Sequence, residues 1–436
     1  MELEVSYKLA TEEQKDLALN ARRILEKELT WEKIQEYEAA DGGKGCYPMD
    51  VHQVMVDAGY YAMSIPEEYG GLGFDPKTIA IIHEEMARVE AGFTFSFNSN
   101  GSHFGYILAT SMPEEKKREW AEIYLAGKTL GCFALTEPDA GSDAAAMRTT
   151  AVKKGDEYVI NGTKCFITNA AEYADHFCVA AWTDKTKSAR EGVTFFFVEK
   201  DRGVQIGKHE DKMGMKLSPT GELIFEDVVV PADHVIGEVG GGFGASMNHI
   251  QMWGRPGGSA IYLGLAQACF DEAVAYAKVR RQFGKRIIDH QGVGFKIARM
   301  QERLYAARSY LYTTFDTLAA GYEDRNMTAG LKKFVTDVAY QNAYDAMQIF
   351  GGYGYMHEYR IEKLFRDSRI FPIFGGTNEI QLKNMAKAIA GRDPEKKKQK
   401  IPKYEYLYSK EVWVFVPCLL AVFCFGNKTS LSGASL

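Results

Sequence analysis

The feature that most constrains the fold is a double change of hydrophobic period along the 436 residues. The first part carries apolar side chains at helical spacing, and it opens with a capping-box pattern at Thr11 and Gln14. From Thr129, short alternating or β-branched runs such as GVTFFFVEK and ELIFEDVVVP take over. Long helical runs return after Gly241. The order predicts a helical domain, then a β domain, then a helical bundle.

These changes of period also predict where each domain begins and ends. The expected units are a helical N-terminal domain over 1–128, a central β domain over 129–240, a C-terminal helical bundle over 241–392 and an atypical tail over 393–436. No internal repeat and no low-complexity tract interrupts this order.

Composition excludes several classes of protein. A hydrophobic content of 46% with 25% charged residues is typical of a folded globular chain, and a net charge of −6 offers no basic field for nucleic acid. Seven scattered cysteines without a C-x-x-C pair favour reduced thiols over disulfides or a metal site. The first residues, MELEVSYKLATEEQ, resemble neither a secretory nor an import signal. We therefore expect a cytoplasmic protein without a metal.

The tail differs from the rest of the chain. Residues 412–425 are apolar but contain Pro417, and a bilayer span needs about 20 apolar residues. The tail is predicted to be disordered or artefactual, and peripheral membrane contact is the alternative.

Two segments of the β domain carry residues that suit a polar, planar ligand. FALTEPDAGSD, residues 133–143, combines hydroxyls, a carboxylate and a Gly141-Ser142 turn, and it is either a ligand loop or a surface turn. In NGTKCFITNA, residues 161–170, Asn161-Gly162 predicts a hairpin. Phe166 and Thr168 are two residues apart, which predicts an aromatic plate and a hydroxyl on one strand face.

Two further segments belong to the predicted bundle. RRQFGKRIIDHQ, residues 280–291, places several cations between two helices and is either a phosphate contact or a solvated loop. QIFGGYGYMHEYRIEKLFRDSRI, residues 348–370, has three glycines in four positions after a helix, where close backbone approach is possible. No strand precedes these glycines, which argues against a Rossmann fingerprint.

Together these segments resemble the acyl-CoA dehydrogenase family over about residues 7–391. FALTEPDAGSD resembles the first family signature, and residues 348–370 resemble the second. KMGMKLSPTGELIFEDVVVP lies between them. The resemblance implies an α-helical N-terminal domain, a β-barrel-like middle domain, a C-terminal four-helix bundle, and FAD shared across a homotetramer interface. It also implies an acyl-CoA substrate and an electron-transferring flavoprotein as electron partner.

The resemblance also assigns roles to individual residues. It implies flavin contacts by Phe133, Leu135, Thr136, Gly141, Phe166 and Thr168, with Ser142 serving FAD or the CoA moiety. The residues implied for the adenine dinucleotide from a neighbouring subunit are Arg280, Phe283, Gln291, Gln348 and Gly352. Thr377 and Glu379 complete the implied cofactor site.

The residues at the two positions where the family carries its catalytic glutamate are both glycines. The resemblance assigns one position to Gly375 and the other, just before Arg255, to Gly254. Glycine cannot accept a proton, although the Gly375 backbone N–H could still polarise a thioester carbonyl. A base would have to come from elsewhere, with Glu90, His103 and Glu379 as candidates, and each of these also has an ordinary structural reading.

Three functions remain open from the sequence. The first is a redox enzyme acting on a CoA thioester, by α,β-dehydrogenation or the reverse reduction. The second is non-oxidative acyl-CoA chemistry such as desulfination, with Gln251 and Arg255 binding the polar end of the substrate. Thr94 stands where the glutaryl branch has a charge-pairing arginine, which argues against a close glutaryl-like substrate. The third is a non-catalytic FAD-binding scaffold.

Overall fold

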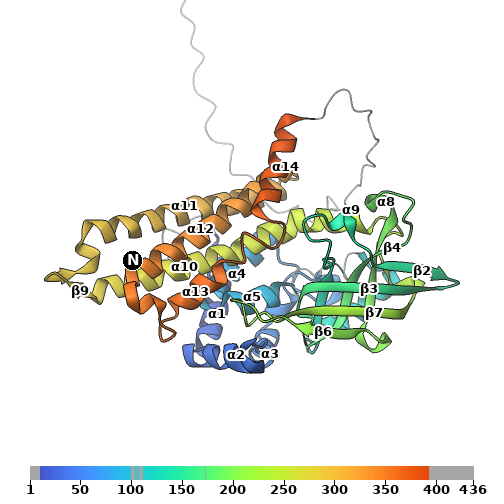
Figure 1. Ribbon diagram of the computed structural model, residues 1–436, viewed down its shortest axis with the longest axis horizontal. Coiled ribbons are helices and arrows are strands. Elements are labelled where there is room, and N and C mark those ends of the chain that lie inside the picture. Colours follow the sequence, from blue (N-terminus) through green and yellow to red (C-terminus); the bar gives the residue numbers. More distant parts are fainter. Residues whose placement is uncertain (1–9, 100–103, 106, 108–110, 172, 392–436) are drawn as a thin grey trace, which may run out of the picture. The chain divides into compact units, whose positions relative to one another are not determined.

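The computed structural model describes residues 10–99, 104–105, 107, 111–171 and 173–391, except the side chains of residues 252 and 253. The predicted tail, 393–436, lies outside these residues. The N-terminal part is helical, as expected (Figure 1). Its helices are α1 (Glu12–Glu28), α2 (Trp31–Gly43), α3 (Met49–Asp57), α4 (Pro76–Val89), α5 (Ala91–Asn98) and α7 (Glu114–Leu125). The predicted capping box is present, with Thr11 Oγ1 accepting from Gln14 N–H.

The middle part forms a mixed sheet with strand order β6-β7-β3-β2-β4-β5-β8, and β1 pairs in parallel with β4. The strands are β1 (Leu130–Ala134), β2 (Thr150–Lys154), β3 (Glu157–Thr168), β4 (Ala174–Trp182), β5 (Val193–Glu199), β6 (Gln205–His209), β7 (Thr220–Pro231) and β8 (Val235–Ile236). A short helix, α8 (Ala189–Gly192), precedes β5. The β-branched runs of the sequence therefore form the strands that they predict.

The hairpin predicted at Asn161-Gly162 is wrong. Both residues lie inside β3, and the β2–β3 connection falls instead between Lys154 and Glu157. The β3–β7 register shifts between Ile160 and Gly162, so the pair marks a bulge within a long strand. The Asn161 side chain bonds both the backbone and the side chain of a residue on β7, which explains why a turn-forming residue is tolerated there.

The C-terminal part is helical, as expected. It contains α9 (Gly242–His249), a π turn (Ile250–Gly254), α10 (Arg255–Val279), α11 (Gln291–Ala319), α12 (Arg325–Phe350), α13 (Ile361–Ser368) and α14 (Asn378–Ala390). A small hairpin of β9 (Arg281–Gln282) and β10 (Lys285–Arg286) links α10 to α11. None of the helices among the described residues is long and apolar enough to cross a membrane.

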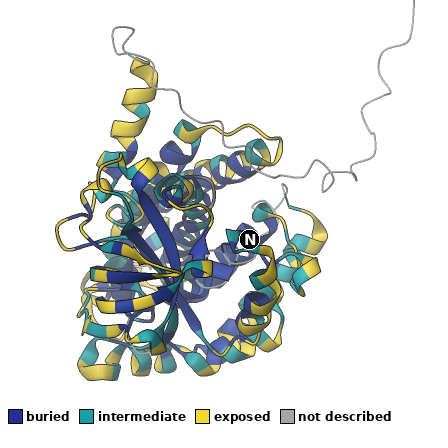
Figure 2. Cartoon of the chain, turned by 90° about the vertical axis from the view of Figure 1, so that its right-hand side faces the viewer, coloured by how far each residue is buried: buried dark blue, intermediate teal, exposed yellow. Residues whose placement is uncertain are grey.

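The sheet has a separate apolar core on each face. Along β4, Cys178 and Ala180 pack with the helices, whereas Phe177 and Val179 pack in the interior of the β domain. This split follows from the alternation of side chains across a strand. Figure 2 shows the central strands buried between these cores, with exposed residues mainly on turns and on outer helix faces.

One glycine sets the distance between two domains. A Cβ on Gly264 of α10 would lie 2.3 Å from the carbonyl oxygen of Glu84 in α4, so only glycine permits this approach. The Glu84 carboxylate is buried next to this contact. Arg308 of α11 donates to it from Nε at 2.8 Å, which ties α11 to the same pair of helices.

A buried ion cluster joins all three parts of the chain. Lys363 of α13 is 0% exposed, and its Nζ lies 2.7 Å from Glu90 Oε2, at the junction of α4 and α5. The same Nζ also bonds Asp367, whose other carboxylate oxygen accepts from Met215 N–H in the β6–β7 loop. Glu90 additionally caps α5 by accepting from Gly92 N–H. One ammonium group therefore holds two buried carboxylates from different domains.

Substituting Lys363→Met should lower the free energy of unfolding by about 3–5 kcal/mol, because Glu90 and Asp367 would stay buried without their cation. Lys333→Met is the matched control, since Lys333 pairs with Asp337 at a half-exposed position. That control should cost less than about 1 kcal/mol. Urea unfolding of both variants measures the difference, and equal costs would contradict this account of the cluster.

Candidate active site

The segment around Gly375 is a tight loop between α13 and α14. Phe374 N–H donates to Ile370 O at 3.1 Å, and Asn378 N–H donates to Pro372 O at 2.9 Å. Gly375 and Gly376 have φ values of +61° and +83°, which favour glycine over any other residue. No atom comes within 4 Å of a Cβ built on Gly375, so the space in front of this residue is open.

The carbonyl side of this loop is anchored from two helices. Gly376 O accepts from Lys332 Nζ of α12 at 3.0 Å and from Gln381 Nε2 of α14 at 2.8 Å. The Gly375 N–H, in contrast, has no hydrogen-bond partner among the described residues. The loop thus presents a backbone donor on an anchored support, which is the arrangement that stabilises negative charge on an acyl oxygen.

Lys332 lies beneath this loop and is 1% exposed. Its other hydrogen-bond acceptor is Asn378 Oδ1, at 3.1 Å, so both of its partners are neutral oxygens. Burial lowers the pKa of Lys332 to about 7, and the neighbouring charge of Arg255 acts in the same direction.

Arg255 begins α10, directly after the π turn that contains Gln251 and Gly254. It is 8% exposed, its Nε has no partner among the described residues, and burial lowers its pKa to about 10. A Cβ on Gly376 would lie 3.8 Å from Arg255 Nη2, so the guanidinium borders the Gly375 loop. The buried Gln251 Oε1 is unpartnered too. π turns are frequent at functional sites.

Aromatic rings from two domains meet beside the loop. The ring centroids of Phe95 in α5 and Phe374 are 4.7 Å apart. Tyr262 of α10 lies 5.8 Å from Phe374 and stacks on Phe371 at 4.4 Å. These rings form an apolar cluster beside Gly375.

Of the three candidate bases, the structure describes Glu90 and Glu379, and no hydrogen bond joins either of them to Gly375. Glu90 is committed to Lys363 and to the cap of α5, while the Thr94 hydroxyl donates to Glu90 O at 2.7 Å and is buried. Glu379 is exposed in the first turn of α14. Thr377, directly before this helix, accepts a hydrogen bond from Ile380 N–H through its hydroxyl oxygen. His103 lies outside the described residues. Glu90 and Thr94 therefore have structural roles in the geometry seen here.

The predicted residues of the β domain line the sheet edge that follows β1. Phe133 stacks on Phe195, with ring centroids 5.2 Å apart, and Leu135 and Thr136 are half-buried. Their backbone is held from β3, because Thr136 O accepts from Cys165 N–H and Leu135 O accepts from Lys164 Nζ. The carboxylate in this motif is structural, since Glu137 pairs with buried Lys164 at 2.8 Å.

The remaining β-domain residues are accessible. Gly141 and Ser142 are exposed in a bend that follows the bridge between Glu137 and Ala140. Phe166 is 65% exposed with a φ of +56°, at a second register shift of β3, and Thr168 is half-buried two residues later. An exposed aromatic ring on a strained backbone is unusual unless a ligand or a partner covers it.

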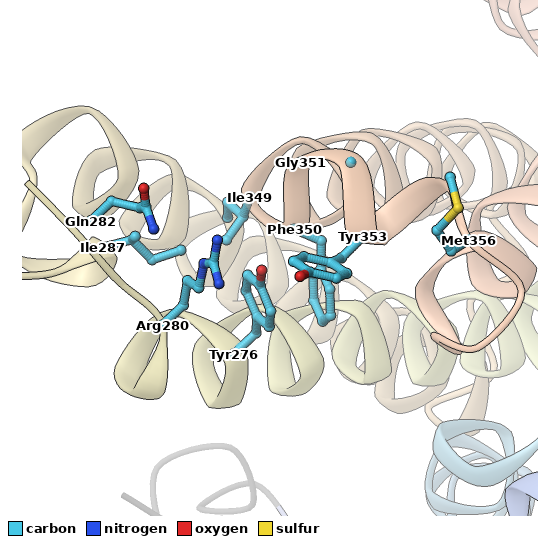
Figure 3. Close-up of a pocket in the computed structure, with 10 residues that line it drawn as sticks. Tyr276, Arg280, Gln282, Ile287, Ile349, Phe350, Gly351, Tyr353 and Met356 are labelled. Carbon is cyan, nitrogen blue, oxygen red and sulfur yellow. The ribbon is translucent and has the colours of Figure 1, made fainter.

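A second group of predicted residues surrounds a cavity of about 460 Å³ (Figure 3). Arg280 lies over the Tyr353 ring at 5.4 Å, and Gly352 contributes open backbone. Other lining residues are Tyr276, Gln282, Ile287, Ile349, Phe350, Gly351 and Met356. Phe283, at the tip of the adjacent hairpin, is 95% exposed. Gln291 and Gln348 are exposed but do not line the cavity.

The two groups of predicted site residues are not brought together in one chain. The β9–β10 hairpin, which follows Arg280, lies at the end of the bundle opposite the sheet that carries Phe166 and Ser142 (Figure 1). Within one chain the two groups therefore do not form a single site.

Sequence reasoning missed the polar residues that hold these sites. Lys332, Gln381 and Lys363 sit on helices among many other charged residues, and nothing local marks them as buried. The one available signal is that Lys332 and Lys363 fall in the apolar stripe of their helices, where a lysine must be satisfied internally.

The chain matches family descriptions in the order of its three parts. Residues 11–128 match the acyl-CoA dehydrogenase N-terminal domain, 132–228 the middle domain, and 240–390 the C-terminal domain. The chain therefore belongs to the acyl-CoA dehydrogenase family. It is an acyl-CoA dehydrogenase-like flavoprotein oxidoreductase that acts on CH–CH groups of CoA thioesters.

Its relatives include enzymes named for either direction of this reaction. The chain is 39% identical over 373 residues to the CarC subunit of the caffeyl-CoA reductase–Etf complex of Acetobacterium woodii, covering 85% of this chain and 96% of the relative. It is 39% identical over 335 residues to the 3-(aryl)acrylate reductase of Clostridium sporogenes, with coverages of 77% and 88%. Butyryl-CoA dehydrogenase of Megasphaera elsdenii has a similar solved structure, with a TM-score of 0.82, 35% identity and coverages of 89% and 100%.

The buried Lys332 should make stability depend on pH. Its pKa is about 7 in the folded chain and about 10.4 when unfolded, so the unfolded state binds more protons between these values. Stability should therefore rise with pH across this window. The charged groups facing Lys332 are Arg255 from α10, Asp337 from its own helix and Glu379 from α14.

The measurement is urea unfolding at pH 7 to 10 for the wild type and Lys332→Met. The free energy of unfolding of the variant should rise less steeply with pH than that of the wild type, whatever the absolute stability of the variant. Identical slopes would mean that Lys332 keeps its proton throughout the window.

Proposed function

We propose that this protein is an FAD-dependent oxidoreductase that converts a CoA thioester between its saturated and α,β-unsaturated forms. The observation that carries this proposal is the unpartnered N–H of Gly375 on a loop anchored by Lys332 and Gln381. A thioester carbonyl accepting from that N–H would be polarised, and negative charge would be stabilised as the α-proton leaves or returns.

The described residues fit the cofactor. Exposed Phe166 offers a stacking surface, Thr168 a nearby hydroxyl, and the Phe133–Thr136 edge a set of half-buried groups for the flavin. The Arg280 cavity, with its open glycine backbone, fits the adenine dinucleotide portion, and Phe283 would cover it. Bound FAD would supply the two-electron acceptor or donor.

Because these two groups lie at opposite ends of the bundle, a complete site requires two copies of the chain. We therefore propose a homotetramer in which the Arg280 group of one subunit serves the Phe166 group of another. An electron-transferring flavoprotein as redox partner is supported by the name of the CarC relative, which is a subunit of an Etf complex. A cytoplasmic location stays a prediction.

The proton transfer is where this chain departs from the family pattern. Gly375 and Gly254 have no side chain to accept the α-proton, and a positioned base contributes a factor on the order of 10²–10⁴. Glu90 is occupied by Lys363, and Glu379 is exposed. We propose that simple saturated acyl-CoAs are poor substrates. The preferred substrate either has an α-proton that is more acidic than in a simple acyl-CoA, or reacts without loss of an α-proton.

A second candidate function follows from Arg255. An unpaired guanidinium beside Gly375 could hold the sulfinate group of a substrate that undergoes desulfination rather than oxidation. The C–S bond would break with its electron pair left on carbon, SO2 would depart and be hydrated to sulfite, and the carbon would take a proton from water, so no base would be needed to remove an α-proton.

Anaerobic mixing with acyl-CoA thioesters tests the function. Protein carrying FAD should lose its flavin absorbance only slowly with butyryl-CoA, because the base is missing. Rapid bleaching by simple saturated acyl-CoAs would contradict this. Turnover of a sulfinyl acyl-CoA without flavin reduction would favour the second function, and thioester binding without any turnover would point to a scaffold.

Restoring the carboxylate should restore the reaction. We expect Gly375→Glu to bleach with butyryl-CoA at least about 10²-fold faster than Gly375→Gln, which has the same shape but no base. Both variants bear the same backbone cost at φ +61°, roughly 1–2 kcal/mol, so their comparison isolates proton transfer. Equal rates would mean that the pocket is organised for different chemistry.

A further inference from the structure

Two buried basic side chains that form no salt bridge among the described residues border the Gly375 loop. Arg255 and Lys332 are 8% and 1% exposed, and their charges act on one another. Among the described residues neither forms a salt bridge, although 0% exposed Lys363 and 4% exposed Arg308 both do. A buried charge without a partner is costly, so this pair marks a place that an anion would stabilise.

The nearby carboxylates do not neutralise the pair. Asp337 is engaged by Lys333 at 2.6 Å and by Asn378 Nδ2 at 2.9 Å. Glu379 is exposed and forms no ion pair among the described residues. Lys332 spends two of its three N–H donors on neutral oxygens, and Arg255 Nε donates to none. Donors for an incoming oxyanion are therefore left over on both residues.

The open space lies on the side where a substrate would enter. A Cβ on Gly375 would meet nothing within 4 Å, and Arg255 Nη2 lies 3.8 Å from a Cβ position on the next residue. A thioester that accepts from Gly375 N–H would thus have its acyl group close to the Arg255 guanidinium. Among the residues that the structure describes, no carboxylate pairs with Arg255, so we expect the charge that balances it to arrive with the ligand.

We propose that the acyl group of the substrate carries its own oxyanion, a carboxylate or a sulfinate, and that Arg255 binds it with Lys332 reinforcing the positive field. This inference rests on the proposed function, because it places a CoA thioester at the Gly375 loop. The rings of Phe95 and Phe374 add apolar surface next to the same loop.

The test compares ligands that differ only in charge. Holoenzyme is titrated anaerobically by calorimetry with succinyl-CoA, with its terminal methyl ester, with butyryl-CoA and with free succinate. We expect succinyl-CoA to bind at least about tenfold more tightly than its methyl ester, the size of a charged hydrogen bond to a buried partner. Equal affinities of the three thioesters would overturn the inference. Equal affinities for free succinate and succinyl-CoA would also overturn it, because they would show that the anion binds independently of the thioester.

Arg255→Met supplies the second arm. The ratio of affinities for succinyl-CoA and its methyl ester should fall to about one, and the ligand-free holoenzyme should melt no lower than the wild type, since an unpaired buried charge is removed. Arg308→Met is the matched control, because it strands the Glu84 carboxylate and should lower the melting temperature while keeping the ratio.

Two outcomes separate this inference from the function on which it rests. Loss of FAD from Arg255→Met would mean that the anion is the cofactor itself and would overturn the proposal. Failure of the wild type to bind any CoA thioester would instead refute the proposed function. Binding of all thioesters without preference for charge refutes this inference and leaves the proposed function standing.

Discussion

The structure depends on one buried ammonium group. Lys363 neutralises Glu90 from the N-terminal helices and Asp367 from its own helix, and Asp367 in turn holds the backbone of Met215 in the β domain. All of these groups are away from water, so none can exchange its partner for solvent without a large cost. The cluster therefore fixes the relative placement of the segments that bring Phe95 and the Gly375 loop together.

The role proposed for the Gly375 loop depends on its backbone rather than on a side chain. Lys332 and Gln381 hold the Gly376 carbonyl, which leaves the Gly375 N–H pointing away from any partner among the described residues. Polarising a carbonyl needs only backbone and is therefore insensitive to the side chain at this position. In the function proposed above, proton abstraction would need a base that the side chain of Gly375 cannot supply, and Arg255 Nε has no hydrogen-bond partner among the described residues.

The two groups of predicted cofactor residues, around Arg280 and around Phe166, show a different constraint. Arg280 and Gly352 surround a cavity at one end of the bundle, whereas Phe166 is exposed on the β domain at the other end. Each group includes an exposed aromatic ring, Phe283 near the Arg280 cavity and Phe166 on the β domain. Assembly of copies would both complete the site and bury these rings, so binding and oligomerisation would be coupled energetically.

The sequence by itself determined the three-part order and the capping box at Thr11, and it marked the segments around Gly375 and Arg280 as candidate functional segments. Hydrophobic periodicity and glycine placement are local properties of the chain, so they can be read without the tertiary structure. It misjudged Asn161-Gly162, where pairing of β3 with β7 overrode a local turn preference. Only the tertiary structure decided that Glu90 pairs with Lys363, while Arg255 and Lys332 form no salt bridge among the described residues. Charge balance depends on which residues meet across helices, and no local pattern encodes those encounters.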